Sequence, residues 1–139
     1  MLALLLSPGC ALFRGRPVEV VHPTGVTPTG VRWRDVLTGV GKVAAPDSVV
    51  TIHYTATLAG GGSIDSSHDR GRPETFPLAA APVLGWADGI PGMREGGRRW
   101  LSVPPHRAFG DEGVEGLIPP GATLEFEIEL LEVKDPGGG

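Results

Sequence analysis

Val83-Leu84-Gly85-Trp86-Ala87-Asp88-Gly89-Ile90-Pro91-Gly92-Met93 is the stretch from which the fold can be worked out. The apolar residues at the three-to-four spacing of one helical face are Val83, Trp86, Ile90 and Met93. Pro91 limits the length of this helix, and Gly92 stands where a left-handed cap would end it. The stretch therefore predicts one short helix of about two turns. A lone helix among strands can lie across a concave sheet, and Trp86 would then form the floor of a pocket.

Strands are predicted on both sides of this helix. The clearest is 48–58, where polar residues alternate with an apolar face made of Val50, Ile52, Tyr54, Ala56 and Leu58. Further strands are predicted at 31–37, 63–65, 75–78, 98–103 and 123–133. Glycines and prolines punctuate these runs, as in the triplet 60–62. The pattern indicates an α+β fold, with an antiparallel sheet of about five strands wrapped on one short helix.

The composition is that of one ordinary globular domain with tails. We predict a tail or linker at residues 1–30, a domain at 31–134 and a disordered C-terminal tail at 135–139. A net charge of −4 without a basic cluster argues against nucleic-acid binding. One cysteine allows no internal disulfide, and the four histidines match no metal motif. No apolar run approaches the length of a membrane-spanning helix.

Residues 1–10 leave the location of the protein open. Small residues precede Cys10, as at the end of a bacterial lipoprotein signal, but the basic start of such a signal is lacking and Ser7 replaces the usual aliphatic residue. One hypothesis is that the true start lies upstream and that Cys10 is lipidated in the cell envelope or periplasm. The other is a disordered tail with an incidental cysteine, which would leave the protein cytoplasmic.

The last predicted strand has an acidic face formed by Glu125, Glu127 and Glu129. Three carboxylates in a row could be taken for a cation site. A solvated strand face is the better interpretation, because polar residues alternate there with buried apolar ones. We expect Arg98 and Arg99 of the preceding strand to lie opposite these carboxylates.

Six segments, in order, resemble the FKBP-type peptidyl-prolyl cis-trans isomerases, and together they span about three-quarters of the chain. The segments are His53-Tyr54-Thr55, Ile64-Asp65-Ser66-Ser67, Gly85-Trp86, residues 92–99, Ala108-Phe109-Gly110 and residues 117–126. No single segment is specific to this family, but the occurrence of all six in this order is. The resemblance implies an antiparallel half-barrel of five to six strands around one short helix, in agreement with the pattern of the residues.

The resemblance also implies a prolyl pocket without a cofactor. Trp86 matches the indole beneath the prolyl ring, Tyr54 and Asp65 match the polar pair at the rim, and Phe109 stands at a position that contacts the ligand carbonyl. The residues that match the pocket wall are Ile64, Phe76, Val83, Leu84, Leu117, Ile118 and Phe126. A backbone N–H of Val83 or Leu84 would hold a substrate carbonyl. Taken singly, these residues would be ordinary core aromatics, strand residues or turn formers.

Three positions depart from the pattern of the family. Phe109 replaces a common tyrosine and lacks its hydroxyl, Glu74 replaces an aromatic wall residue and would leave one side of the pocket open, and Ile64 replaces a larger phenylalanine. A missing neutral hydrogen bond costs about 0.5–1.5 kcal/mol. We therefore expect the fold and the reaction to survive and the affinity for macrolide inhibitors to be reduced.

Two main functions remain open at this point. The first is an active isomerase that acts on Pro-containing segments of client proteins and assists their folding. The second is a non-catalytic module of the same fold that binds prolyl or apolar segments; Phe109 and Glu74 favour it. A structural lipoprotein is a third idea that rests on Cys10 alone. For each we expect a monomer that binds no nucleic acid.

Overall fold

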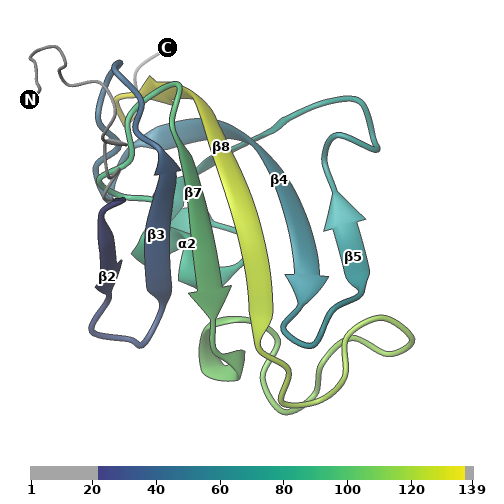
Figure 1. The fold of residues 1–139 in the computed structure, drawn as a ribbon. Helices are drawn as coiled ribbons and strands as arrows, with labels where there is room; N and C mark the ends of the chain where they lie inside the picture. The colour runs from purple at the N-terminus through teal and green to yellow at the C-terminus, as the bar shows by residue number, and fades with distance from the viewer. Residues whose placement is uncertain (1–21, 137–139) are drawn as a thin grey trace, which may run out of the picture.

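One antiparallel sheet contains all the strands that the computed structural model describes, within residues 22–136. The strands are β2 (Thr24–Val26), β3 (Arg32–Leu37), β4 (Val49–Leu58), β5 (Ser63–Ser66), β6 (Glu74–Pro77), β7 (Arg98–Val103) and β8 (Leu124–Lys134). Their order is β2-β3-β7-β8-β4-β5 (Figure 1), and β6 pairs with the beginning of β4. Two 3₁₀-helices, η1 (Leu78–Ala80) and η2 (Pro105–Arg107), and one α-helix, α2 (Leu84–Gly89), complete the described elements. None of these helices is long and apolar enough to cross a bilayer. The predicted fold class is confirmed.

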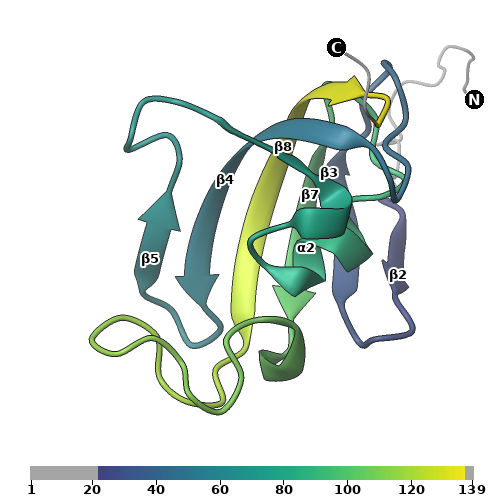
Figure 2. The ribbon, with the colours of Figure 1, turned by 180° about the vertical axis from the view of Figure 1, so that it is seen from behind.

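The alternation of the central strands determines which face of the sheet is covered. In β4 the residues Val50, Ile52, Tyr54 and Ala56 are buried, as predicted. Strand β8 pairs with β4 along its length and buries its own alternate residues in the same layer. Successive side chains of a strand point to opposite faces, so both strands present their apolar sides to α2. Figure 2 shows α2 lying across this face, with the loop between β7 and β8 below it at the lower ends of the strands.

Helix α2 has the position and the ends that its sequence predicts. Val83 precedes it in extended conformation, and its carbonyl accepts the Trp86 N–H at 3.0 Å. Gly92 follows with φ 95°, which is the left-handed conformation that glycine adopts without a steric penalty. The four residues predicted to share one face, Val83, Trp86, Ile90 and Met93, are all at most 7% exposed. The predicted helix is thus confirmed.

Two glycines allow α2 to approach β7 closely. A Cβ atom built on Gly89 would lie 2.6 Å from a methyl group of Leu101, and one on Gly85 would overlap the side chain of Val103. Real Cβ atoms do not come so near to other heavy atoms, so larger residues would push the helix away from the sheet. The depth of Trp86, which lies between the two glycines, depends on this approach.

One predicted pairing on β7 is wrong. Arg98 does face Glu127 across the sheet at 4.0 Å, but Arg99 points to the other side and is 5% exposed. Its guanidinium binds both carboxylate oxygens of Asp35 on β3, with Nε at 2.6 Å and Nη2 at 3.2 Å. Nη1 donates to the carbonyl of Gly89 at the end of α2, at 2.9 Å. Alternation in the strand places neighbouring arginines on opposite faces, which is why only one of them can meet the acidic row.

One described strand lies within residues 1–30, the segment predicted as an N-terminal tail or linker. Thr24–Val26 forms β2 at the edge of the sheet, with Gly25 opposite Trp33, and the carbonyl of Pro23 accepts the N–H of Asp35 at 2.9 Å. A strand of three residues is too short to show a period, so pattern alone does not reveal it. Cys10, and the end of the predicted C-terminal tail from residue 137, lie outside the described residues.

The ion pair inside the sheet should matter far more for stability than the one outside it. Asp35→Ala leaves the buried Arg99 without its counter-charge, and we expect the free energy of unfolding to fall by about 3–5 kcal/mol. Glu127→Ala removes the exposed partner of Arg98, and we expect a loss of about 0–1 kcal/mol. Denaturant unfolding of both variants measures the difference. Equal losses would contradict the structural role given to Arg99.

Candidate functional site

A cavity of about 380 Å³ opens between α2, the covered face of the sheet and the loop that joins β7 to β8. Its lining residues are Tyr54, Ala56, Ile64, Asp65, Arg70, Glu74, Pro82, Val83, Trp86, Phe109, Val114, Leu117, Ile118, Leu124 and Phe126. Most of these side chains are apolar, and the charged ones all come from the segment 65–74. The size and character are those of a site for a small molecule or a single side chain, which typically occupies about 300–1,000 Å³.

Trp86 lies at the bottom of this cavity, held by three other aromatic rings. Its ring centroid is 4.8 Å from that of Tyr54, 5.3 Å from that of Phe126 and 5.5 Å from that of Phe76. These contacts leave the indole 2% exposed. Its Nε1 is the one buried side-chain polar atom that lacks a hydrogen-bond partner within residues 22–136. An unpaired buried donor costs about 1–3 kcal/mol, so the surrounding packing must hold the ring in place.

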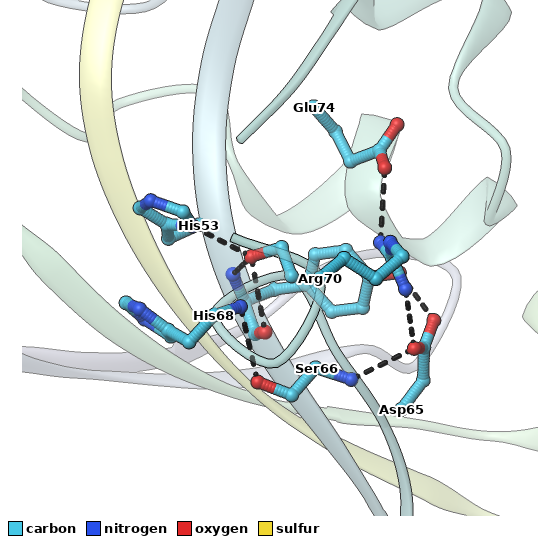
Figure 3. Close-up of polar contacts among 8 residues, drawn as sticks. His53, Asp65, Ser66, His68, Arg70 and Glu74 are labelled. Carbon is cyan, nitrogen blue, oxygen red and sulfur yellow. Dashed lines mark hydrogen bonds and ion pairs between the residues drawn. The ribbon is translucent and has the colours of Figure 1, made fainter. Parts of the chain in front are cut away.

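One edge of the cavity carries a network of four polar side chains (Figure 3). The Tyr54 hydroxyl donates to Oδ2 of Asp65 at 2.5 Å. Arg70 donates from Nη1 to Oδ1 of Asp65, and from Nη2 both to the Tyr54 oxygen at 3.0 Å and to Oε2 of Glu74 at 2.9 Å. Figure 3 shows the guanidinium of Arg70 between the carboxylates of Asp65 and Glu74. Because a tyrosine hydroxyl has one proton, the donor of Tyr54 is already used.

The network fixes the protonation of its members at neutral pH. The hydrogen bond from Tyr54 lowers the pKa of Asp65, and the N–H of Ser66 and the charge of Arg70 act in the same direction. Burial raises the pKa of Tyr54, and the adjacent carboxylate of Asp65 raises it further. The hydrogen bonds to Tyr54 and Glu74 raise the pKa of Arg70. Asp65 is therefore ionised and Tyr54 protonated over the physiological range.

The segment that bears Asp65 and Arg70 is attached to β4 behind Tyr54. Oγ of the buried Ser67 accepts the backbone N–H of Tyr54 at 2.8 Å, and the Ser67 N–H donates to the Tyr54 carbonyl at 3.0 Å. His53 Nδ1 lies 2.8 Å from the same Oγ, and the ring of His53 stacks on that of His68 with centroids 4.1 Å apart (Figure 3). These contacts hold the polar edge of the cavity against the sheet.

A second ion pair positions the opposite wall. Arg107, at the end of η2, donates from Nε to Oδ2 of Asp88 at 2.7 Å and from Nη2 to Oδ1 at 3.0 Å. Asp88 belongs to α2, and its Oδ2 also accepts from the hydroxyl of Thr29 at 2.8 Å. Because Phe109 follows Arg107 by two residues, the wall formed by the β7–β8 loop is tied to the helix that carries Trp86.

The structure brings most of the predicted site residues together. Those that line the cavity are Tyr54, Ile64, Asp65, Val83, Trp86, Phe109, Leu117, Ile118 and Phe126. Phe76 is not in the lining but stacks against Trp86 from outside the cavity. The side chain of Leu84 is also absent from the lining, and the residue is 50% exposed. Leu84 is the first residue of α2, so its N–H has no acceptor inside the helix.

Glu74, which was expected to leave one side of the pocket open, lines the cavity together with Arg70, and its carboxylate accepts a hydrogen bond from the Arg70 guanidinium. Sequence reasoning missed Arg70, whose signal was only an opposite charge four residues before Glu74. It also missed Ala56 and Leu124, which strand alternation could have found, since each lies two residues from a predicted site residue on the same face. Pro82 and Val114 gave no signal.

No group of three or more His, Cys, Asp or Glu side chains that could hold a metal ion occurs in the part of the chain from 22 to 136. The polar groups of the cavity are two carboxylates, a guanidinium and a phenol, joined by hydrogen bonds. The cavity has an apolar floor and a polar edge. It can bind the apolar ring of a residue while the peptide groups on either side of that residue stay at the rim.

The chain matches known proteins over the described domain. The family model of the FKBP-type peptidyl-prolyl cis-trans isomerases matches residues 41–131. The FK506-binding protein of Neisseria meningitidis serogroup B is 45% identical over 105 residues, which cover 75% of this chain and 96% of that protein. FK506-binding protein 1 of Debaryomyces hansenii is 52% identical over 89 residues, which cover 63% of this chain and 80% of that protein.

Solved structures agree with these sequence matches. The crystal structure of AtFKBP13 superposes with a TM-score of 0.71 at 36% sequence identity, and the match covers 79% of this chain and 98% of that one. The residues matched by the family model include every lining residue of the cavity. The chain belongs to the FKBP-type peptidyl-prolyl cis-trans isomerase family.

Proposed function

We propose that the cavity catalyses rotation about Xaa-Pro bonds by seating the prolyl ring on Trp86 and withdrawing water from the imide. The observation that supports this proposal is an apolar cavity of about 380 Å³ with an indole at its bottom and all its charged groups on one edge. A pyrrolidine ring fits the apolar part, and the peptide backbone on either side of the ring would remain near the polar edge. Client segments that contain proline are the proposed substrates.

The physical basis of the reaction is the amide resonance of the Xaa-Pro bond. Rotation about this bond faces a barrier of about 18–20 kcal/mol, while the cis and trans forms differ by only about 0.5–1 kcal/mol. Water stabilises the planar form, because that form has the more polar carbonyl. A dry cavity removes this stabilisation and favours the twisted imide. Each 1.36 kcal/mol removed from the barrier raises the rate about tenfold, so a thousandfold acceleration needs about 4 kcal/mol.

The polar edge supplies fixed charges to this step and no nucleophile. We propose that Asp65 faces the strained imide as a carboxylate, held in place by the hydroxyl of Tyr54 and by Arg70. The Tyr54 hydroxyl can donate to a substrate only if it first gives up its hydrogen bond to Asp65. Its first role would therefore be to position that carboxylate. We also propose that the N–H of Leu84, which has no acceptor in the helix, binds a substrate carbonyl.

We further propose that macrolides such as FK506, which gives the relatives their name, bind the same cavity with reduced affinity. Phe109 lines the cavity and is 37% exposed, but it has no hydroxyl to donate. We propose that the protein acts as a monomer, because a single copy of the chain already forms a cavity with a floor, walls and a polar edge.

Replacement of the floor should reduce catalysis more than replacement of the rim. We expect Trp86→Leu to lower kcat/KM for an Xaa-Pro tetrapeptide by about tenfold or more, because the apolar surface under the prolyl ring is lost. Asp65→Leu should lower it by about threefold. A protease-coupled isomerisation assay measures both variants, with thermal unfolding as the check that each is folded.

Trp100→Leu is the matched control, because Trp100 lies on the outer face of the sheet beneath Arg34 and should not affect turnover. Full activity in both site variants would show that the assignment of the site is wrong. Peptide binding by the wild type without any acceleration over the uncatalysed rate would identify a binding module instead of an enzyme.

The lowered pKa of Asp65 predicts where its contribution ends on the acid side. Its carboxylate is present above the lowered pKa and is lost as the pH falls through that value. We expect the ratio of kcat/KM between wild type and Asp65→Asn to be constant from about pH 5 to pH 8, and to approach one only below about pH 4. The ratio cancels the titration of groups that both proteins share. A midpoint near pH 6 would contradict this protonation state.

A restored hydroxyl should strengthen macrolide binding. We expect Phe109→Tyr to lower the Kd for FK506 by about 2- to 12-fold, which corresponds to a net hydrogen bond of about 0.5–1.5 kcal/mol. Titration calorimetry measures the change, and Phe109→Leu, which alters the ring without adding a donor, serves as the comparison. An unchanged Kd in the tyrosine variant would mean that residue 109 does not face the ligand carbonyl.

A further inference from the structure

The charged residues of the cavity leave its mouth with a negative charge. Among the lining residues, those ionised at neutral pH are Asp65, Arg70 and Glu74, so two carboxylates oppose one guanidinium and the sum is −1. All three lie on one edge, where Figure 3 shows Arg70 between the two acids. The side chains of Asp65 and Glu74 are 41% and 39% exposed, so both carboxylates are accessible from solvent.

The one positive charge among these lining residues, that of Arg70, is already bound to other side chains of the edge. Arg70 donates from Nη1 to Asp65, and from Nη2 to Tyr54 and Glu74. An acidic substrate side chain could bind Arg70 only by displacing one of these acceptors. In contrast, Oε1 of Glu74 accepts no hydrogen bond from the described residues, so a basic side chain can approach it directly.

The other side of the mouth carries no compensating cation. A hollow under the β7–β8 loop adjoins the cavity and shares Val114, Leu117 and Ile118 with it. Glu112 and Glu115 line this hollow, and no lysine or arginine does. Arg107, which lies nearby in the sequence, is bound to Asp88 and is only 24% exposed at its side chain. Acidic side chains therefore line both sides of the mouth, and Arg70 is the one basic residue in either lining.

We propose that Glu74 is a specificity-determining residue and that, among charged residues before proline, the site prefers lysine or arginine to glutamate or aspartate. This proposal rests on the proposed function, because it places the prolyl ring on Trp86 and the imide beside Asp65. The residue before proline carries the imide carbonyl, so its side chain emerges at the edge that Asp65, Arg70 and Glu74 form. Glu74 adds the carboxylate that turns this edge from neutral to negative.

The size of the effect follows from Coulomb's law. The interaction energy of two unit charges about 7 Å apart in water is about 0.6 kcal/mol, and an energy of this size changes a rate about threefold. Inversion of the charge on Xaa from Lys to Glu should therefore change kcat/KM by about ninefold at low ionic strength. Salt at about 1 M reduces the Debye length to about 3 Å and should abolish most of this preference.

The test compares three peptides that differ only in Xaa, namely Lys, Gln and Glu. Exchange between cis and trans forms is measured by NMR, because a coupling protease would add its own specificity. For the wild type we expect kcat/KM to fall in the order Lys, Gln, Glu. In Glu74→Gln, which keeps the shape of the side chain, we expect the Lys-to-Glu ratio to fall about threefold or more.

Glu127→Gln is the matched control, since it removes one carboxylate from the exposed outer face of the sheet and should leave the ratio unchanged. Loss of the preference in high salt tests the same charge effect in the wild type, without any variant. Equal rates for Lys and Glu peptides, or a ratio that Glu74→Gln leaves unchanged, would overturn the proposal. No acceleration for any of the peptides would overturn the proposed function itself.

Discussion

The close approach of helix α2 to strand β7 is the constraint on which the rest of the structure depends. Gly85 and Gly89 bring the helix backbone within contact of Val103 and Leu101, because no Cβ atom stands between them. At that distance Trp86 reaches the layer where the rings of β4 and β8 meet, and its indole becomes the bottom of a cavity. If larger residues moved the helix away from β7, the indole of Trp86 would be loosely packed or exposed to water.

Buried charge holds this arrangement in place. Arg99 connects Asp35 on β3 with the carbonyl that ends α2, and its guanidinium lies 4.2 Å from the ring centroid of Trp33. A buried guanidinium is tolerated only with partners for its charge and its donors, so these contacts specify one position of the helix end against the sheet. Asp88 performs a similar role at the other wall, where it binds Arg107 and so ties the β7–β8 loop to α2.

The cavity that results separates two tasks. Its floor is apolar, which suits the proposed withdrawal of water from a bound imide in a reaction without bond cleavage. Its edge concentrates Tyr54, Asp65, Arg70 and Glu74 in one hydrogen-bonded network, in which Tyr54 and Arg70 lower the pKa of Asp65. The floor is common to any prolyl ring, whereas the edge lies where substrates differ. Catalysis and selection between substrates can thus be altered by different residues.

Most of the fold and of the cavity lining could be predicted from the sequence, because both follow from local periods. Alternation identified the buried face of β4, the three-to-four spacing identified the face of α2, and the order of short motifs placed Trp86, Tyr54 and Asp65 in one pocket. Contacts between residues far apart in the chain could not be predicted from the sequence pattern. The partner of Arg99 lies 64 residues away, and β2 is too short to show a period. Glu74 taken alone suggested an open wall, and only the fold shows that its carboxylate binds Arg70 at the edge of the cavity, because side-chain pairing depends on distances in space.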